Sequence, residues 1–391
     1  MQKSWIIFLS VIKNCIGNGP DKVEEQSATE EKSLTCKEIQ LSAEEKATIE
    51  ALAKQRGLFP SLPGKAYLNA DRFYALMYGG LNVLNILENN GIEAAIVKGV
   101  SLAALYPLPE QRLFSDVDVL LRYERDLKKA VEVLTENGWT CSDEKQPHHL
   151  SFTCNGITAE LHFKPVRPFE KRSINKAIEY AFNSDDTIFI EEELFGVKYK
   201  TLKPSIFGFY ILIHNLEHFL LRGMGVKHLC DMAVFWNKQY NEEVYKEYKA
   251  LVRMAGLDKF SDCMTLCTQE YLGLSNENAE KMLVDCRGVL TQALLENIMI
   301  DIIDAGNFGE LEKDRLVSLR SDGIGGMVSQ IHCRMKENFP RLSKFFLIWP
   351  ILWLATVMIF IRNNKKIRGE KSSSIIKKAQ SRGRLVRMLD I

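Results

Sequence analysis

Two aspartates at the start of an apolar stretch are the residues best suited to chemistry. Asp116 and Asp118 flank Val117, and Val119, Leu120 and Leu121 follow. Residues two apart on a β-strand point to the same face, so the two carboxylates would converge while the valines face a core. Neighbouring carboxylates repel each other unless a cation lies between them, and Mg²⁺ prefers oxygen ligands. The pattern predicts a divalent metal site on a strand, although an exposed strand edge without a metal has the same residue pattern.

A third acid lies on a later alternating run. In residues 157–163 the apolar side chains alternate with Thr158, Glu160 and His162, which predicts a strand with one polar face. Three acids can hold two metal ions that clamp a transferring phosphoryl group. We therefore expect Asp116, Asp118 and Glu160 to be the metal-binding and catalytic residues, with Mg²⁺ or Mn²⁺ as the ion.

A glycine between the first apolar run and a short helix could accommodate phosphate. Lys98, Gly99 and Ser101 follow residues 94–97, where a glycine lets the backbone approach a ligand and the helix start and lysine supply positive potential. Arg112 and Ser115, just before the aspartates, could add phosphate contacts. These five residues are the predicted binding site for the triphosphate of a nucleotide such as ATP.

The elements that must position these residues have a clear order. Residues 94–97 predict a strand, 101–106 a short helix, 117–121 a strand and 123–137 an amphipathic helix. Two alternating runs, 149–154 and 157–163, are separated by Asn155-Gly156, the strongest short-range hairpin signal. This order predicts an α/β (α+β) domain with a small mixed sheet.

The remaining chain predicts helices. A helical pattern covers 68–90, and an earlier one covers 42–56. After Pro204 the patterns are almost all helical, over 210–222, 229–236, 243–254, 260–272 and 289–303. We predict four parts: an N-terminal helix and polar linker at 1–47, the α/β domain with its leading helices at 48–203, an all-helical domain at 204–340, and an apolar segment with a basic tail at 341–391.

The amino-acid composition limits the kinds of partner and the cellular compartment that we expect. Lys and Arg total 51 against 50 Asp and Glu, so the net charge of +1 indicates no nucleic-acid or acidic partner. Nine scattered cysteines without a C-x-x-C pair favour reduced thiols in a cytoplasmic protein. The apolar run at 5–12 ends at Lys13 and predicts an amphipathic helix rather than a signal peptide.

The C-terminal stretch has three interpretations. Residues 345–361 carry no charge, contain Pro350 and have basic residues on both sides. They could lie on an anionic membrane surface, span the membrane or pack against the helical domain. Peripheral membrane contact through 345–387 is therefore one expected interaction. The basic tail lacks the interleaved aromatic residues that would favour nucleic acid.

Together these segments resemble a known family. Residues 96–107, Arg112, 115–121 and 159–162 are similar to the bacterial "uncharacterised nucleotidyltransferase" family of the DNA polymerase beta-like superfamily. The resemblance implies a nucleotidyltransferase domain followed by helices, with Gly99 and Ser101 in the glycine motif, Asp116 and Asp118 as the metal pair and Glu160 as the third acid. The sequence departs from the superfamily pattern at Val100, where Gly-Gly or Gly-Ser is usual.

The resemblance extends into the helical half. His214, His218, Arg222, 225–231, 306–309 and Pro350-x-x-Trp353 are similar to recurring family features, so coverage runs from about 45 to 391. We expect His162, His214, His218, Arg222 and Asp231 to line an acceptor pocket. The implied reaction is Mg²⁺-dependent transfer of a nucleoside monophosphate from a nucleoside triphosphate to an unidentified acceptor.

Three alternatives stay open. His214, Glu217 and His218 form an H-x-x-E-H pattern, which is typical of one class of zinc metallopeptidase. The chain could instead be a non-catalytic nucleotide-binding module of the same fold. A tRNA-modifying toxin-like transferase is the third alternative, but the Lys-Gly-Gly motif of such relatives is absent.

Overall fold

The computed structural model describes residues 63–183, 188–221, 223–283, 290–305, 342–368 and 382–391, with a few positions between 328 and 339. Its contacts divide the chain into two units. The first comprises Met1–Glu217 and Lys227–Val289, and the second comprises His218–Val226 and Leu290–Ile391. The predicted helices at 5–12 and 42–56 lie outside the described residues. The four-part division predicted from the sequence remains a prediction.

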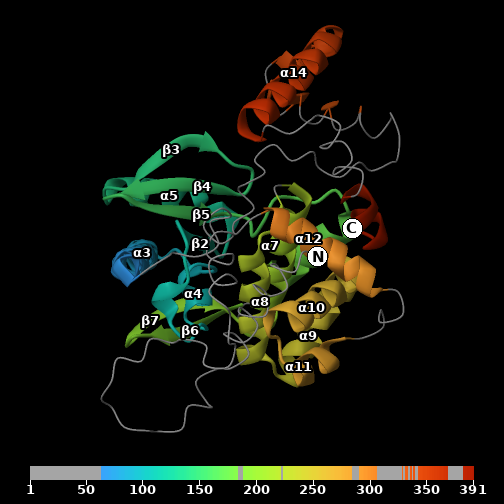
Figure 1. The fold of residues 1–391 in the computed structure, drawn as a ribbon. Helices are drawn as coiled ribbons and strands as arrows, with labels where there is room; N and C mark the ends of the chain where they lie inside the picture. The colour runs from blue at the N-terminus through green and yellow to red at the C-terminus, as the bar shows by residue number, and fades with distance from the viewer. Residues whose placement is uncertain are drawn as a thin grey trace. The chain divides into compact units, whose positions relative to one another are not determined.

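A five-stranded mixed sheet organises the first unit (Figure 1). Its order is β1-β2-β5-β4-β3, and only β2 and β5 run parallel; the neighbouring pairs are antiparallel. The strands are β1 (Ala94–Ile96), β2 (Val117–Leu121), β3 (Thr140–Lys145), β4 (His149–Cys154) and β5 (Ile157–His162). The predicted small mixed sheet and its strand at 117–121 are confirmed.

The predicted hairpin forms at Asn155-Gly156. Both residues have positive φ, 49° and 76°, as a two-residue turn between twisted strands requires. The turn fixes the register of β4 against β5, so that Phe152 lies opposite Ala159 and His149 lies opposite His162. Every second side chain of β5 then faces the same side of the sheet.

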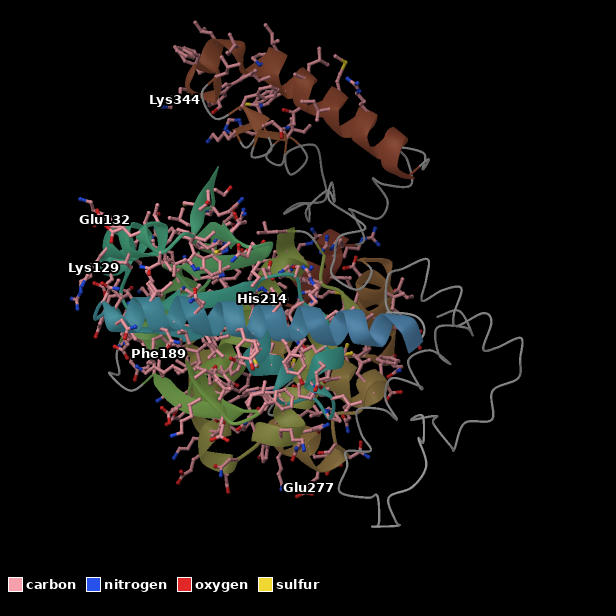
Figure 2. The ribbon with its side chains drawn as sticks, turned by 90° about the vertical axis from the view of Figure 1, so that its left-hand side faces the viewer. Lys129, Glu132, Phe189, His214, Glu277 and Lys344 are labelled. Atoms are coloured by element: carbon pink, nitrogen blue, oxygen red, sulfur yellow. The ribbon has the colours of Figure 1, made fainter. Side chains whose placement is uncertain are left out.

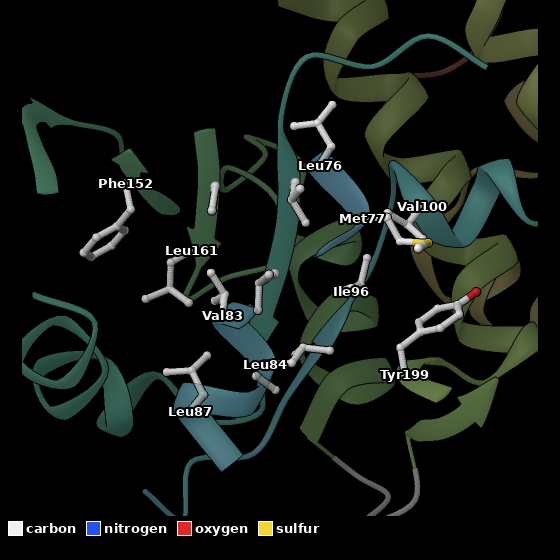
Figure 3. Packing of buried hydrophobic residues seen from close by; sticks show 14 of the residues in the cluster. Leu76, Met77, Val83, Leu84, Leu87, Ile96, Val100, Phe152, Leu161 and Tyr199 are labelled. Carbon is white, nitrogen blue, oxygen red and sulfur yellow. The ribbon is translucent and has the colours of Figure 1, made fainter. Parts of the chain in front are cut away.

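Helices cover one face of this sheet. Helix α3 (Pro63–Asn89) packs on β1, β2 and β5, and α5 (Leu127–Glu136) packs on α3 and β3. Figure 2 shows α3 lengthwise, as the long blue helix. In Figure 3 Val83, Leu84 and Leu87 of α3 lie close to Leu161 and Ile96 of the sheet. Because the alternate residues Val117, Val119, Ala159 and Leu161 belong to this core, Asp118, Glu160 and His162 face the opposite side.

Two adjacent glycines allow α3 to approach the sheet closely. A Cβ at Gly79 would lie 2.7 Å from the Cγ2 atom of Ile157, and one at Gly80 would lie 2.7 Å from the Cγ1 atom of Val117. Glycine inside a helix lowers its stability by about 0.5–1 kcal/mol relative to alanine. Here the missing side chains bring the helix backbone directly onto β2 and β5.

The structure contains elements that the sequence patterns did not predict. Strand β3 has the polar sequence Thr-Cys-Ser-Asp-Glu-Lys, which lacks an alternating apolar face. A second hairpin, β6 (Phe189–Leu194) and β7 (Val197–Leu202), turns at Phe195-Gly196, and β7 contacts β1. Helices α6 (Arg172–Asn183) and α11 (Asn276–Met282) also belong to the first unit and were not predicted. Helix α4 (Val100–Ala103), in contrast, corresponds to the short helix predicted at 101–106.

The described residues after Pro204 are mostly helical, as predicted. The first unit contains α7 (Pro204–Leu221, whose last turn belongs to the second unit), α8 (Val226–Gln239), α9 (Glu242–Ala255) and α10 (Asp258–Leu272). The second unit contains α12 (Gln292–Ala305) and α14 (Trp349–Arg368). Among the helices that the structure describes, none is long and apolar enough to cross a membrane.

One part of the basic C-terminal tail packs within the second unit. Arg382 is buried, forms an ion pair with Asp301 at 3.2 Å and donates a hydrogen bond to the carbonyl of Phe219. Leu385 and Leu389 beside it are also buried. The helical turn at the C-terminus is amphipathic, and its leucines hold this end of the tail in the second unit.

Candidate active site

The parallel pairing of β2 and β5 brings two predicted acids together. Asp118 and Glu160 are directly opposite each other in the register, and both side chains leave the sheet on the face away from α3. A sheet spacing of about 4.8 Å therefore separates their backbones. The side chain of Asp118 is 6% exposed and that of Glu160 is 23% exposed, so Glu160 is the more accessible acid.

Asp118 is the centre of a network of charged groups. Its Oδ1 atom lies 2.7 Å from Nζ of Lys98 and 3.0 Å from Nε2 of His162. The Nε2 atom of His162 also lies 3.4 Å from Oε2 of Glu160. One imidazole thus contacts both carboxylates, and Lys98 supplies the positive charge that two buried acids need.

These contacts decide which acids are ionised. Burial by itself would raise the pKa of Asp118, but the Lys98 ammonium and the hydrogen bond with His162 hold it well below its usual range. Burial likewise opposes ionisation of Glu160, while the hydrogen bond with His162 outweighs it and lowers the pKa of Glu160. Both carboxylates are therefore negative at neutral pH.

Asp116 lies next to this pair. Burial and the negative charges of Asp118 and Glu160 raise the pKa of Asp116 to about 6. The neighbouring acids thus repel the Asp116 carboxylate, as the sequence pattern implies for two aspartates so close together. A divalent cation would relieve that repulsion.

The glycine loop adopts a conformation that requires glycine. Gly99 has φ 47° and ψ −102°, and a Cβ there would lie 3.1 Å from the ring of Phe114. The Ser101 hydroxyl donates to the carbonyl of Ile96 at 2.8 Å and contacts Thr201 Oγ1 at 3.1 Å. In this state Ser101 ties the loop to β1 and β7, and its predicted phosphate contact remains a prediction.

Arg112 and Asp231, predicted for phosphate and for the acceptor, bind each other. Nε and Nη2 of Arg112 donate to the two carboxylate oxygens of Asp231 at 2.7 and 2.8 Å, and Nη1 donates to the carbonyl of Gly99 at 2.9 Å. The Tyr106 hydroxyl donates to Asp231 at 2.7 Å. This buried pair anchors the glycine loop to α8, which is a positioning role that the sequence did not reveal.

Of the remaining residues that the sequence predicted for the site, only some lie near the acids in the described part of the chain. His214 on α7 lies near the acids, since its Nε2 is 3.1 Å from Nζ of Lys98. His218 follows one turn later on α7, and Arg222 lies outside the described residues. Ser115 is exposed, and its carbonyl accepts a hydrogen bond from Arg72 at 3.2 Å.

The residues present fit a divalent metal ion. Asp118, Glu160 and His162 each offer a ligand atom, and these atoms lie within 4.8 Å of one another. The two carboxylates are oxygen ligands of the kind that Mg²⁺ and Mn²⁺ take, and Asp116 lies alongside. His162 is the member of this group for which the sequence predicted an acceptor role instead.

A comparison with protein families agrees with this geometry. The profile of the family described as "Uncharacterised nucleotidyltransferase" matches residues 59–273, which is more than half of the chain. The chain belongs to the uncharacterised nucleotidyltransferase family. The match includes the glycine loop, all three acids and helices α7 to α10.

Comparisons with solved structures and with curated proteins show little similarity. A crystal structure of an antigenic nucleotidyltransferase-like protein from Paracoccidioides brasiliensis is similar at 14% sequence identity and a TM-score of 0.29. The similarity covers 44% of this chain and 85% of that one. Comparison with curated proteins gave no match.

Two histidines that the sequence patterns did not single out lie beside the candidate site. His148 and His149 lie beside His162, with ring centroids 5.5 and 5.0 Å from its own, and Nε2 of His149 is 3.5 Å from Oε1 of Glu160. The signal was present, because the Asn155-Gly156 turn places residue 149 opposite residue 162 in the hairpin register.

Proposed function

We propose that this member of the family transfers a nucleoside monophosphate from a nucleoside triphosphate to an acceptor hydroxyl or phosphate in a Mg²⁺-dependent reaction. Family membership supports nucleotidyl transfer as the class of reaction. The observation that carries the finer proposal is the placement of Asp118 opposite Glu160 on parallel strands, with Lys98 2.7 Å from Asp118.

In this proposal the acids have different roles. Asp116, Asp118 and Glu160 hold the ion, which would neutralise charge on the phosphoryl oxygens. Glu160, the more exposed acid, orients the acceptor and takes its proton as the acceptor oxygen bonds to the α-phosphorus and the bond to pyrophosphate breaks. His162 keeps both carboxylates aligned through its Nε2 atom.

The positive groups bind the nucleotide in the same proposal. When no nucleotide is bound, Lys98 balances the charge of Asp118. With nucleotide bound, its ammonium group would contact a phosphate beside Asp118. Gly99 lets the loop backbone approach the triphosphate, and the Arg112–Asp231 pair fixes that loop. His214 and His218 on α7 remain candidates for the acceptor pocket.

The two alternatives in other classes have weaker support. In a zinc peptidase of the H-x-x-E-H type Glu217 is the free base, whereas here its Oε1 atom lies 3.5 Å from Nε of Arg167. A non-catalytic binding module has no need of paired acids here, whereas Asp118 lies opposite Glu160 and beside Lys98. Both observations favour the transferase.

The position of the transferred label tests this proposal. Full-length protein, Mg²⁺ and each of the four nucleoside triphosphates, labelled at the α- or γ-phosphate, would be incubated with separate sugar, RNA and protein fractions of a cell extract. We expect only α-label to move into one fraction, with release of pyrophosphate, and Asp118→Asn to abolish it. Transfer of γ-label, or equal α-transfer by Asp118→Asn, would contradict the proposal.

We also propose that α14 and the turns before it rest on an anionic membrane surface. Leu347, Ile351, Leu354 and Met358 recur at helical spacing and are each at least 62% exposed. Phe345 and Phe346 are exposed beside them, and the exposed Lys344 and Arg362 lie at the two ends. An apolar stripe with basic ends is typical of helices that lie in a membrane interface.

A further inference from the structure

Three histidines gather at one end of the β4–β5 hairpin. His149 and His162 are opposite each other in the antiparallel register, and His148 precedes β4. One ring nitrogen from each lies within 4.8 Å of the other two. The chain has seven histidines, so three of them lie at this one place.

Packing alone does not account for this cluster. His148 and His162 are 7% and 2% exposed, and the Nδ1 atom of each is buried with no hydrogen-bond partner in the described part of the chain. A buried polar atom without a partner costs about 1–3 kcal/mol. A metal ion bound at these rings would offset part of that cost.

Two of the three histidines contact a carboxylate through one ring nitrogen, as metal-binding histidines often do. A histidine that binds a metal through one nitrogen usually holds a carboxylate or a carbonyl with the other. Nε2 of His162 contacts Asp118 at 3.0 Å, and Nε2 of His149 lies 3.5 Å from Glu160. His148 contacts His149 through Nε2 at 3.1 Å, which leaves its Nδ1 atom as the unpartnered one.

The electrostatic surroundings also favour a cation. Asp118 and Glu160 supply negative charge next to the cluster, opposed by Lys98.

We infer that His148, His149 and His162 form a binding site for one divalent transition-metal ion of the Zn²⁺ class, next to the predicted Mg²⁺ position at the acids, whose carboxylates His162 contacts. Imidazole nitrogens suit Zn²⁺ and Co²⁺, whereas Mg²⁺ prefers oxygen. Tetrahedral coordination with metal–nitrogen bonds of about 2.0–2.1 Å places the three ring nitrogens roughly 3.3 Å apart. The side chains would rotate slightly on binding to reach this spacing. Three protein ligands leave the fourth position for water.

The ion would stiffen the site. It links β4 to β5 beside the acids, and through His162 it fixes the orientation of Asp118. The inference goes beyond the proposed transfer reaction, because the ion binds without nucleotide and without Mg²⁺.

Co²⁺ is the probe that tests this site. Full-length, chelator-stripped protein would be titrated with Co²⁺ in a large excess of Mg²⁺, with the visible absorption of four-coordinate Co²⁺ as readout. We expect one equivalent to bind and to be displaced by Zn²⁺. His148→Gln and His149→Gln should each weaken Co²⁺ binding by roughly tenfold or more. His332→Gln is the matched control, since His332 contacts Trp353 instead, and it should bind like the wild type.

Several results would overturn the inference. These are no Co²⁺ absorption with wild-type protein, its loss in excess Mg²⁺, or equal Co²⁺ binding by both histidine variants, each checked for native circular dichroism. Asp116→Asn separates this site from the proposed reaction, because it should bind Co²⁺ while losing nucleotide transfer. Transfer could fail altogether and the Co²⁺ result would still decide the histidine site.

Discussion

Charge compensation at single residues determines what this site can do. Asp118 is buried yet ionised because Lys98 and His162 contact the same oxygen. Arg112 and Asp231 show the same principle, since each would be an isolated buried charge without the other. The residue types pointed to Asp118 and Lys98, but the pairing of Arg112 with a residue 119 positions away depends on tertiary structure that no local pattern contains.

The Arg112–Asp231 pair should contribute strongly to stability. Asp231→Asn leaves the buried guanidinium without its counter-ion, and we expect the free energy of unfolding to fall by about 3–5 kcal/mol. Urea denaturation of the two proteins measures this. Glu132→Gln, which removes an exposed partner of Lys128, is the control and should change stability by less than about 1 kcal/mol. A change below 1 kcal/mol for Asp231→Asn would show that the pair is dispensable.

The same pair should make stability depend on acid. Burial opposes the charge of Asp231, but the Arg112 guanidinium outweighs this and lowers its pKa below the ordinary value of 3.8. A lowered folded-state pKa means that the stabilisation is complete above about pH 4 and is lost as the pH falls through the folded pKa. The difference in unfolding free energy between wild type and Asp231→Asn should therefore be constant near neutrality and shrink below about pH 4. A difference that grew as the pH fell would contradict this assignment.

At the scale of elements, the sequence predicts what local patterns encode. The Asn155-Gly156 turn, the strand at 117–121 and the helices after Pro204 follow from turn chemistry and apolar spacing. Strand β3 could not be predicted that way, because an edge strand with polar side chains has no apolar face. The hairpin register was available from the turn and would have placed His149 opposite His162. The parallel pairing of β2 with β5 was not, since the intervening elements set it.

The contact of α3 with the sheet should depend on its glycines. Gly80→Ala gains about 1 kcal/mol of helix propensity, but its Cβ would lie 2.7 Å from Val117, and we expect a net loss of about 1–3 kcal/mol. Asn85→Ala on the exposed side of the same helix is the control, with no loss. Thermal unfolding measures both. A Gly80→Ala protein more stable than wild type would mean that the helix does not press on β2.

At the scale of the whole molecule, the described parts combine a mixed sheet that carries the candidate site with helices and an exposed apolar helix. Family membership covers residues 59–273, and α14 lies beyond that range. The sequence favoured neither membrane contact nor burial for residues 345–361, because both need apolar side chains. The side chains of Ile351, Leu354 and Met358 are exposed. An exposed apolar patch of this kind favours contact with an apolar surface, such as that of a membrane.

The membrane proposal predicts selective binding to acidic lipid. Full-length protein should co-sediment with vesicles that contain phosphatidylserine and bind much less to neutral phosphatidylcholine vesicles. Replacing Leu347, Ile351 and Leu354 with serine removes the apolar stripe and should abolish sedimentation, whereas Glu132→Gln should not. Equal sedimentation of the triple variant would contradict the proposal.

Mg²⁺-dependent nucleotide binding tests the central claim most directly, because it needs no acceptor. Calorimetric titrations would cover ATP, GTP, CTP and UTP, with Mg²⁺ or with a chelator, using wild type, Asp118→Asn, Glu160→Gln and the control Glu132→Gln. Glu160 is partly exposed, so Glu160→Gln keeps the test valid if Asp118→Asn fails to fold. We predict that at least one nucleotide binds only with Mg²⁺ and that both acid variants weaken it roughly tenfold or more. Binding that ignores Mg²⁺, or that the acid variants leave unchanged, would contradict the assignment of Asp118 and Glu160 as the metal-binding acids of a nucleotidyltransferase.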